Sequence, residues 1–254
     1  MTFPPFGRPA FERATWIIPE LVTGVDFHVN FADLPQHFNG QPQNIGILLG
    51  EPSGGLIDMD LDTPESIRIA PRFLPKTDLV FGRESKPRSH WVYHITGDIP
   101  RCEKWEVKAD KGAGIAGVMI VEMRGTGAQT VFPPSVHRDT GESICFDTLD
   151  EPARVDAATL RVAVRKVAAG ALLAQFWPTG SRWEAALSLA GGLGRAGWKE
   201  SEIAEFIEAV ADAADDDDTA STFIPCGARS APLEQRQGRS SHRPGRDAAQ
   251  QDRS

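Results

Sequence analysis

The chain has 254 residues, enough for a full hydrophobic core in one large domain or two small ones. Its composition, 41% hydrophobic and 24% charged, is ordinary for a globular protein; without an 18-residue apolar run or a basic segment leading into an apolar one, we expect no membrane span and no secretion signal. A formal net charge of −8 argues against binding of nucleic acid through bulk positive charge, although it is compatible with a local basic groove.

The first 44 residues are rich in Pro, Gly and Phe, and residues 15–18 fit a short edge strand. Two apolar runs follow at residues 45–49 and 56–61, on either side of a Pro-Ser-Gly-Gly turn. Two apolar runs around such a turn most simply form a β-hairpin. The second run is predicted to be a buried strand.

Acidic residues alternate with apolar ones at the end of this run, at Asp58, Asp60 and Asp62. On a strand, Asp58 and Asp60 share a face about 6.5–7 Å apart. Two carboxylates side by side in a buried setting repel each other and lose hydration, and a bound Mg²⁺ or Mn²⁺ ion removes both costs. The alternative is a strand end that runs into solvent. We expect Asp62 to cap the next helix or to face solvent.

A helix follows, with Thr63 as its N-cap and Pro64 at its first position, and it ends before Pro75. Short strands are predicted over residues 79–81 and 89–95, the second of them rich in strong β formers. The sequence between them is a basic turn.

The basic turn carries Arg83, Lys86 and Arg88, and His90 follows at the start of the next strand. A histidine in this position is usually an ordinary, satisfied polar residue. Beside it, however, a cluster of guanidinium and ammonium groups can hold phosphate oxygens. We therefore interpret the cluster as a candidate phosphate-binding site.

Further strands are predicted over residues 104–108, 117–125 and 129–132. Glu122 and Arg124 lie on one face of the middle strand of these three. They form either an internal ion pair or a third carboxylate beside a phosphate-binding guanidinium. Two consecutive prolines end the last strand and fix an extended segment that can place Ser135 and His137.

Three motifs occur together in this order: Asp-Met-Asp after a Gly-rich turn, a basic loop leading to Ser-His on a strand, and Val-Glu-Met-Arg-Gly-x-Gly-x-Gln-Thr-Val-x-Pro-Pro-Ser-x-His. Over roughly residues 10–150 the chain resembles the N-terminal domain of bifunctional DNA primase/polymerases (prim-pol), in the archaeo-eukaryotic primase superfamily. The resemblance implies an α+β fold, with a primase-polymerase catalytic core built on a mixed, RNA-recognition-motif-like β-sheet. It also implies template-directed nucleotidyl transfer with two divalent metal ions, Mg²⁺ or Mn²⁺.

The resemblance also implies roles for individual residues. Asp58 and Asp60 match the family's paired acids, and Glu122 matches the third metal-binding and catalytic acid. His90 matches the histidine that contacts the phosphates of the incoming nucleotide, and Arg124 stands where relatives often have Arg-Gly. The expected substrate-binding set is His90, Arg124, Arg88 and Lys86.

The chain departs from the family in two ways. Relatives often carry a lysine-bearing segment near the N-terminus, whereas the first lysine here is Lys76. Many relatives are fused to a helicase, but this chain has no Gly-x-x-x-x-Gly-Lys-Ser/Thr phosphate loop. We therefore expect unwinding to come from a separate helicase.

The composition changes after residue 151, where three helices are predicted. Asp156 caps the first, which runs to about residue 175, and Ser181 and Glu184 have the spacing of a capping box for the second. The third, over residues 200–214, is acidic with an apolar stripe. Such a module either helps to hold template or nucleotide or serves for packing.

The expected organisation is a catalytic domain over residues 1–151, a helical module over 152–218 and a disordered tail over 219–254. The tail carries six Arg against three acids and has almost no periodic apolar content. Cys102, Cys145 and Cys226 are far apart and odd in number, and they form neither a zinc pattern nor a disulfide framework. This pattern favours a reducing, cytoplasmic location.

The leading hypothesis is a DNA primase/polymerase of a mobile-element-type replication system, acting with a single-stranded DNA template and dNTP or NTP and without a membrane. The first alternative is a catalytically weak or inactive replication-initiation protein that binds nucleotide or single-stranded DNA. The second alternative is a metal-dependent nuclease using the same acids.

Overall fold

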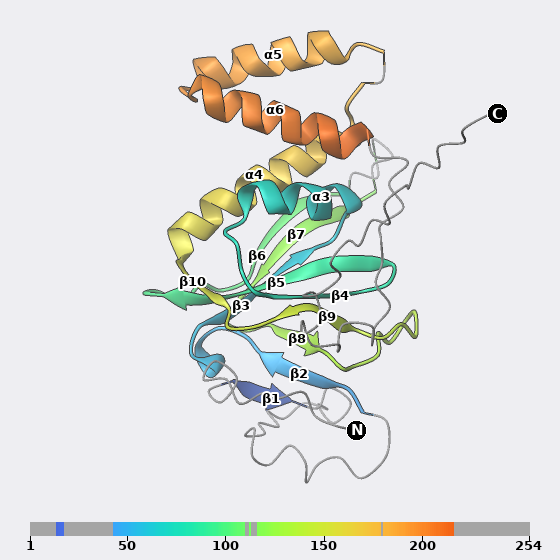
Figure 1. Cartoon of the computed structure of the whole chain (residues 1–254), viewed down its shortest axis with the longest axis vertical. Coiled ribbons are helices and arrows are strands. Elements are labelled where there is room, and N and C mark those ends of the chain that lie inside the picture. The colour runs from blue at the N-terminus through green and yellow to red at the C-terminus, as the bar shows by residue number, and fades with distance from the viewer. Residues whose placement is uncertain (1–13, 18–42, 110–111, 113–115, 179, 216–254) are drawn as a thin grey trace, which may run out of the picture. The chain divides into compact units, whose positions relative to one another are not determined.

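A computed structural model describes residues 14–17, 43–109, 112, 116–178 and 180–215 of the chain, and the predicted tail lies outside them. Figure 1 shows two β-sheets, with helices packed on the larger one. The larger sheet has seven strands in the order β6-β7-β3-β5-β4-β9, and β10 pairs with β5 off this path. The strand bounds are β3 Leu56–Leu61, β4 Leu79–Arg83, β5 Lys86–Thr96, β6 Glu103–Val107, β7 Val118–Arg124, β9 Cys145–Leu149 and β10 Ala153–Asp156.

The larger sheet is mixed, because β10 runs parallel to β5 while the other pairs are antiparallel. Together with the helices this confirms the predicted α+β class. The smaller sheet is antiparallel, with the order β1-β2-β8. Its strands are β1 Thr15–Ile17, β2 Ile45–Leu48 and β8 Gln129–Phe132.

The predicted hairpin between the first two apolar runs is wrong. Strand β2 belongs to the smaller sheet and β3 to the larger one, and the two runs share only an isolated bridge between Gly50 and Leu56. A 3-10 turn over Glu51–Ser53 redirects the chain after Gly50, whose φ of 80° favours glycine. Both strands are buried, so each needs partners along both edges, and sequence-distant strands supply them.

The helices α3 Pro64–Phe73, α4 Ala157–Gln175 and α6 Glu200–Asp215 pack on one another, and α5 Arg182–Arg195 packs on α6. The caps of the first two helices are as predicted: Thr63 accepts a hydrogen bond from Ser66 N, and Asp156 accepts one from Thr159 N. The predicted capping box at α5 is wrong, since the Ser181 side chain makes no capping hydrogen bond. Its backbone, at φ −135° and ψ 40°, is outside the extended conformation usual for an N-cap.

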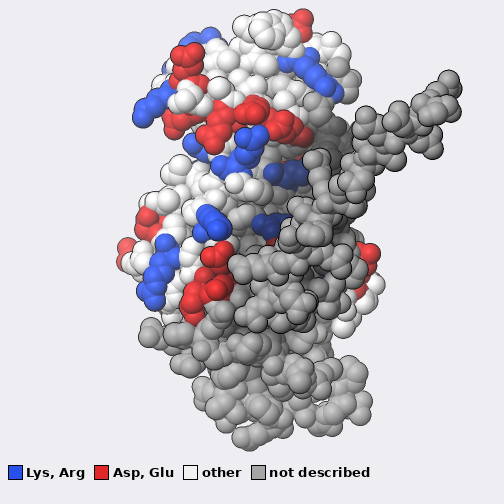
Figure 2. Space-filling model, viewed as in Figure 1, with Lys and Arg blue, Asp and Glu red and all other residues white. Residues whose placement is uncertain are grey.

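Acidic side chains gather over α6 in Figure 2, and several pair with basic residues of α3 and α4. Arg72 lies 2.7 Å from Asp212 and 3.6 Å from Glu208, and Lys166 lies 3.8 Å from Glu202. The acidic stretch therefore has an internal role in docking α6. Such exposed pairs contribute little individually, so most of the docking free energy comes from buried apolar groups.

Strand β3 alternates between two cores. Ile57, Met59 and Leu61 face a core shared with α3, α4 and α6, while Leu56 faces a second core that includes residues of the smaller sheet. Asp58 and Asp60 alternate with the first set, so they lie on the face turned away from the helices. The fold thus places both carboxylates on the side of the sheet that the smaller sheet covers.

The helical segment is joined closely to the sheet, because β10 pairs with β5 and α4 contributes Val164 and Val167 to the same core as β3. The boundary at residue 151 stays a prediction. No described helix is long and apolar enough to span a membrane. Among the described residues, Cys102 is a free thiol, as expected.

Candidate active site

The candidate site lies at the centre of the larger sheet, where β3 is flanked by β5 and β7. Asp60 is directly opposite His90 on β5 and Glu122 on β7, and Asp58 is opposite Arg124. Directly opposed residues of antiparallel strands point to the same face of the sheet. Five of the seven predicted site residues are therefore brought together on one face by strand register alone.

The Arg124 guanidinium holds the acids together. Its Nη2 lies 2.5 Å from Asp60 Oδ2, its Nε lies 2.8 Å from Glu122 Oε2, and its Nη1 lies 4.0 Å from Asp58 Oδ2. Burial lowers the pKa of Arg124, but the carboxylates of Asp60 and Asp58 outweigh it, so the net shift in pKa is upward. Arg124 thus stays charged and offsets part of the repulsion among the acids.

His90 contacts both aspartates on the other side. Its Nδ1 lies 2.9 Å from Asp58 Oδ2, its Nε2 lies 3.8 Å from Asp60 Oδ1, and its ring stacks on Phe81 at a centroid distance of 4.5 Å. Burial lowers the pKa of His90, but the two carboxylates raise it further, and the pKa ends above its ordinary value. The protonated imidazole, which can bind an anion, is therefore favoured in the folded protein.

Two buried carboxylate oxygens accept no hydrogen bond from a described residue, although Asp60 Oδ1 lies within ion-pair distance of His90 and Lys86. Asp58 Oδ1 and Asp60 Oδ1 make no hydrogen bond with any described residue, although Asp58 is 0% and Asp60 5% exposed. A buried, unsatisfied carboxylate oxygen is costly, and a divalent cation is the ligand that satisfies hard oxygens of this kind. The pair therefore fits Mg²⁺ or Mn²⁺.

Glu122 is placed differently from the two aspartates. One of its oxygens contacts Arg124, and the other lies 3.4 Å from Lys104 Nζ. Among the described residues, no group of three or more potential ligands is arranged as a metal centre. The structure thus brings Glu122 beside the pair, and its role as a third metal ligand stays a prediction.

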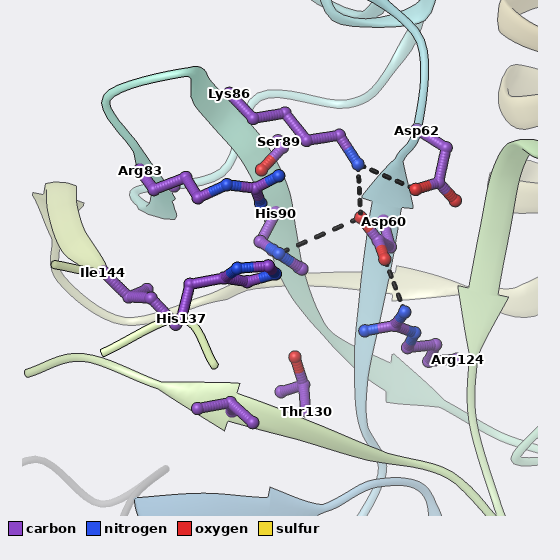
Figure 3. Close-up of a pocket in the computed structure, with 12 residues that line it drawn as sticks. Asp60, Asp62, Arg83, Lys86, Ser89, His90, Arg124, Thr130, His137 and Ile144 are labelled. Carbon is purple, nitrogen blue, oxygen red and sulfur yellow. Dashed lines mark hydrogen bonds and ion pairs between the residues drawn. The ribbon is translucent and has the colours of Figure 1, made fainter. Parts of the chain in front are cut away.

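A cleft of about 340 Å³ opens in front of Asp60 (Figure 3). Asp58 and Glu122 are not among its lining residues, so Asp60 is the member of the acidic group that the cleft exposes. The lining residues are Asp60, Asp62, Gly82, Arg83, Lys86, Ser89, His90, Arg124, Thr130, Val131, His137 and Ile144.

The Lys86 side chain contacts two of the acidic residues that line the cleft. Its Nζ lies 2.7 Å from Asp62 Oδ1 and 3.7 Å from Asp60 Oδ1. The expectation that Asp62 caps the helix or faces solvent is wrong, because Thr63 is the cap and Lys86 holds Asp62 in the cleft. Burial and the neighbouring Asp60 raise the pKa of Asp62, and Lys86 opposes that rise.

Arg88 is not brought to the cleft. Its guanidinium pairs with Asp147 and lies over the Trp91 ring, 5.4 Å from the centroid. The φ of Arg88 is 54°, which breaks the regular alternation of side chains along β5. Arg83, from the same basic turn, lines the cleft instead.

Several lining residues were not predicted as site residues. Ser89 and Thr130 are buried hydroxyl residues whose Oγ and Oγ1 atoms have no hydrogen-bond partner among the described residues. His137 also lines the cleft, as the double-proline segment had suggested, whereas Ser135 is used structurally: its Oγ accepts a hydrogen bond from Ile45 N at 2.9 Å. Thr130 carried no signal in the sequence, because its position depends on packing between the two sheets.

The turn after His137 is linked to the β4–β5 turn by Glu142. Its carboxylate accepts hydrogen bonds from Ser85 N at 2.7 Å, Ser85 Oγ at 2.7 Å and Arg83 Nε at 3.1 Å. The hydrogen bonds from Ser85, followed by those from Thr140 and the charge of Arg83, lower the pKa of Glu142 from 4.5 to about 2.

This lowered pKa gives a prediction for stability. A carboxyl whose pKa is depressed by folding stabilises the folded state above its unfolded pKa, and this contribution is lost as the pH falls through the folded pKa. The contribution of Glu142 should therefore be complete above pH 4.5 and disappear towards pH 2. In urea titrations between pH 6 and pH 2, roughly the range that brackets both pKa values, Glu142→Gln should lose less stability than wild type. Parallel curves of stability against pH for the two proteins would contradict this prediction.

The fold and the site together define a class: an α+β protein with paired acids on a central strand beside a cleft lined with cations, an arrangement suited to phosphoryl transfer. The family model for the N-terminal domain of bifunctional DNA primase/polymerases matches residues 27–158, which is more than half of the chain. The chain belongs to this family, a family of nucleotidyltransferases that act on a DNA template with nucleotides and generally use divalent metals. Neither a curated protein nor a solved structure matches it.

Proposed function

We propose that this chain is an active, template-directed DNA primase/polymerase of a mobile-element-type replication system. The observation that carries the proposal is the pair Asp58 and Asp60, each with a buried oxygen that accepts no hydrogen bond from a described residue, next to a cleft lined with cationic side chains. Phosphoryl transfer demands positioning and charge neutralisation rather than covalent chemistry from the protein. The reaction therefore requires carboxylates that hold metal ions and cationic side chains that bind phosphates.

Within this proposal, Asp58, Asp60 and Glu122 hold two Mg²⁺ or Mn²⁺ ions. When bound, such ions lower the pKa of the attacking 3′-hydroxyl and neutralise charge on the leaving pyrophosphate. Asp60 reaches the cleft directly, while Asp58 supports it from the buried side. Glu122 would have to exchange its contact with Arg124 or Lys104 for this role.

The cationic residues would bind the triphosphate. Lys86, His90 and Arg124 all line the cleft, and each already contacts a carboxylate there. A guanidinium or imidazolium in a partly buried site forms short, charge-assisted hydrogen bonds with phosphate oxygens. Arg83 takes the place in this set that the sequence assigned to Arg88.

The partners of the proposed activity are a single-stranded DNA template, dNTP or NTP and a separate helicase, in the cytoplasm. We further propose that the helical segment after residue 151 helps to hold template or nucleotide. Its α4 packs against β7, the strand that carries Glu122 and Arg124, which supports a link between this segment and the site.

The test is incorporation of labelled nucleotide on a single-stranded template, with and without a primer. Reactions contain dNTPs or NTPs and either Mg²⁺ or Mn²⁺, and the products are resolved by length. The expected result is new or lengthened strands that depend on both template and metal. Shortened substrate without added nucleotides would indicate a nuclease instead.

A second candidate is a replication-initiation protein that binds nucleotide or single-stranded DNA without incorporation. The contacts of Arg124, His90 and Lys86 favour it, because these side chains already neutralise much of the acidic cluster. Nucleotide binding in a fluorescence titration, combined with no incorporation under either metal, would support this candidate.

A further inference from the structure

Two turns meet at one side of the cleft. The turn between β4 and β5 carries Ser85, and the turn that follows His137 is closed by hydrogen bonds from Gly141 N to His137 O and from His137 N to Glu142 O, both 2.8 Å. Glu142 stands at the end of the second turn and reaches across to the first. One carboxylate therefore receives three hydrogen bonds from residues about 57–59 positions away in sequence.

The geometry of these bonds orients Arg83. Glu142 accepts from the Nε atom of Arg83, and Ser85 Oγ lies 3.2 Å from the same atom. The two terminal amino groups of the guanidinium make no hydrogen bond with a described residue. In Figure 3, Arg83 extends from its strand toward Lys86 and His90. The free edge of the guanidinium is thus presented to the cleft, with 19% of the side chain exposed.

We propose that Glu142 is a positioning residue that fixes Arg83 so that its terminal amino groups grip a phosphate of the incoming nucleotide. The proposal rests on the proposed polymerase function. A planar guanidinium with two parallel N–H donors matches a phosphate group, but only when its orientation is fixed beforehand. An arginine side chain left free loses this pre-organisation and must be ordered at each binding event.

The hydrogen bonds of Glu142 indicate that it positions Arg83 and does not merely neutralise the charge of that side chain. Ser85 supplies two of the three hydrogen bonds to Glu142, so the carboxylate is held by the β4–β5 turn as well as by Arg83. A carboxylate anchored in this way acts as a fixed point for the guanidinium. It touches neither Asp58 nor Asp60, and it does not line the cleft. Loss of Glu142 should therefore weaken nucleotide affinity more than it slows the chemical step.

The experiment compares steady-state incorporation by Glu142→Ala, Arg83→Gln and the double variant with wild type. Glu142→Ala should raise the KM for nucleotide about tenfold while kcat changes less than about twofold. Arg83→Gln should raise KM at least as much. In the double variant the KM should equal that of Arg83→Gln, because Glu142 acts through Arg83.

Glu84→Gln is the matched control, since it removes the same charge from the neighbouring position of the same turn. Glu84 is exposed and makes no hydrogen bond or ion pair with a described residue. The KM of Glu84→Gln for nucleotide should therefore equal that of wild type. A purely structural role for Glu142 would instead lower kcat and leave KM unchanged. That result, or an additive double variant, would overturn the proposal. If wild type itself incorporates no nucleotide, the polymerase function fails, and a titration with fluorescent nucleotide then shows whether Glu142→Ala still weakens phosphate binding.

Discussion

Replacing both Asp58 and Asp60 with asparagine should reduce nucleotide incorporation by at least about 10³-fold. Asparagine keeps the size of the side chain but removes the negative charge that holds a divalent cation. Each of the two substitutions also removes a charge that raises the pKa of His90, so the protonated imidazole becomes less favoured. Primer extension on a single-stranded template, with products resolved by length in Mg²⁺ and in Mn²⁺, measures the effect.

Asp78→Asn is the control for this experiment. The Asp78 side chain is 59% exposed and lies 3.9 Å from Lys76, outside the cleft, so this variant should extend primers as well as wild type does. Circular dichroism of the double variant checks that it is folded. A folded double variant that still extends a primer would show that the metal site is assigned to the wrong residues.

Replacing Phe206 with alanine should cost about 3–5 kcal/mol of unfolding free energy. The side chain is 2% exposed, and its ring lies 5.8 Å from the Phe73 ring of α3 and 5.4 Å from the Trp198 ring, as centroid distances. Truncation removes these contacts and leaves a cavity where α6 meets α3 and α4. Urea unfolding followed by tryptophan fluorescence and by circular dichroism measures the loss.

Phe176→Ala is the matched control, because the same substitution at a side chain that is 75% exposed should change stability by no more than about 0.5 kcal/mol. The form of the transition also tests the predicted domain boundary at residue 151. Since Phe73 belongs to the sheet-covering helix α3, loss of Phe206 should shift one cooperative transition. Two transitions, of which only one moves, would instead show that the helical segment unfolds as an independent module.

The sequence by itself determined the features that depend on local periodicity. Alternation along β3 placed Asp58 and Asp60 on one face, since side chains of a strand have a period of two. The helix starts at Thr63 and Asp156 followed from capping chemistry, which involves only a few neighbouring residues. The prediction of Asp58 and Asp60 as a pair and of the family both rest on such local patterns and their order.

The tertiary structure decided which distant strands pair and where long side chains end. Sequence periodicity could not show that β2 and β3 belong to different sheets, because burial of both edges is satisfied by partners far along the chain. Local alternation also misplaced Arg88, whose positive φ redirects its side chain, and gave no indication of Glu142, which acts across two turns. Hydrogen bonds between such distant residues depend on the packing of both sheets, which no short stretch of sequence encodes.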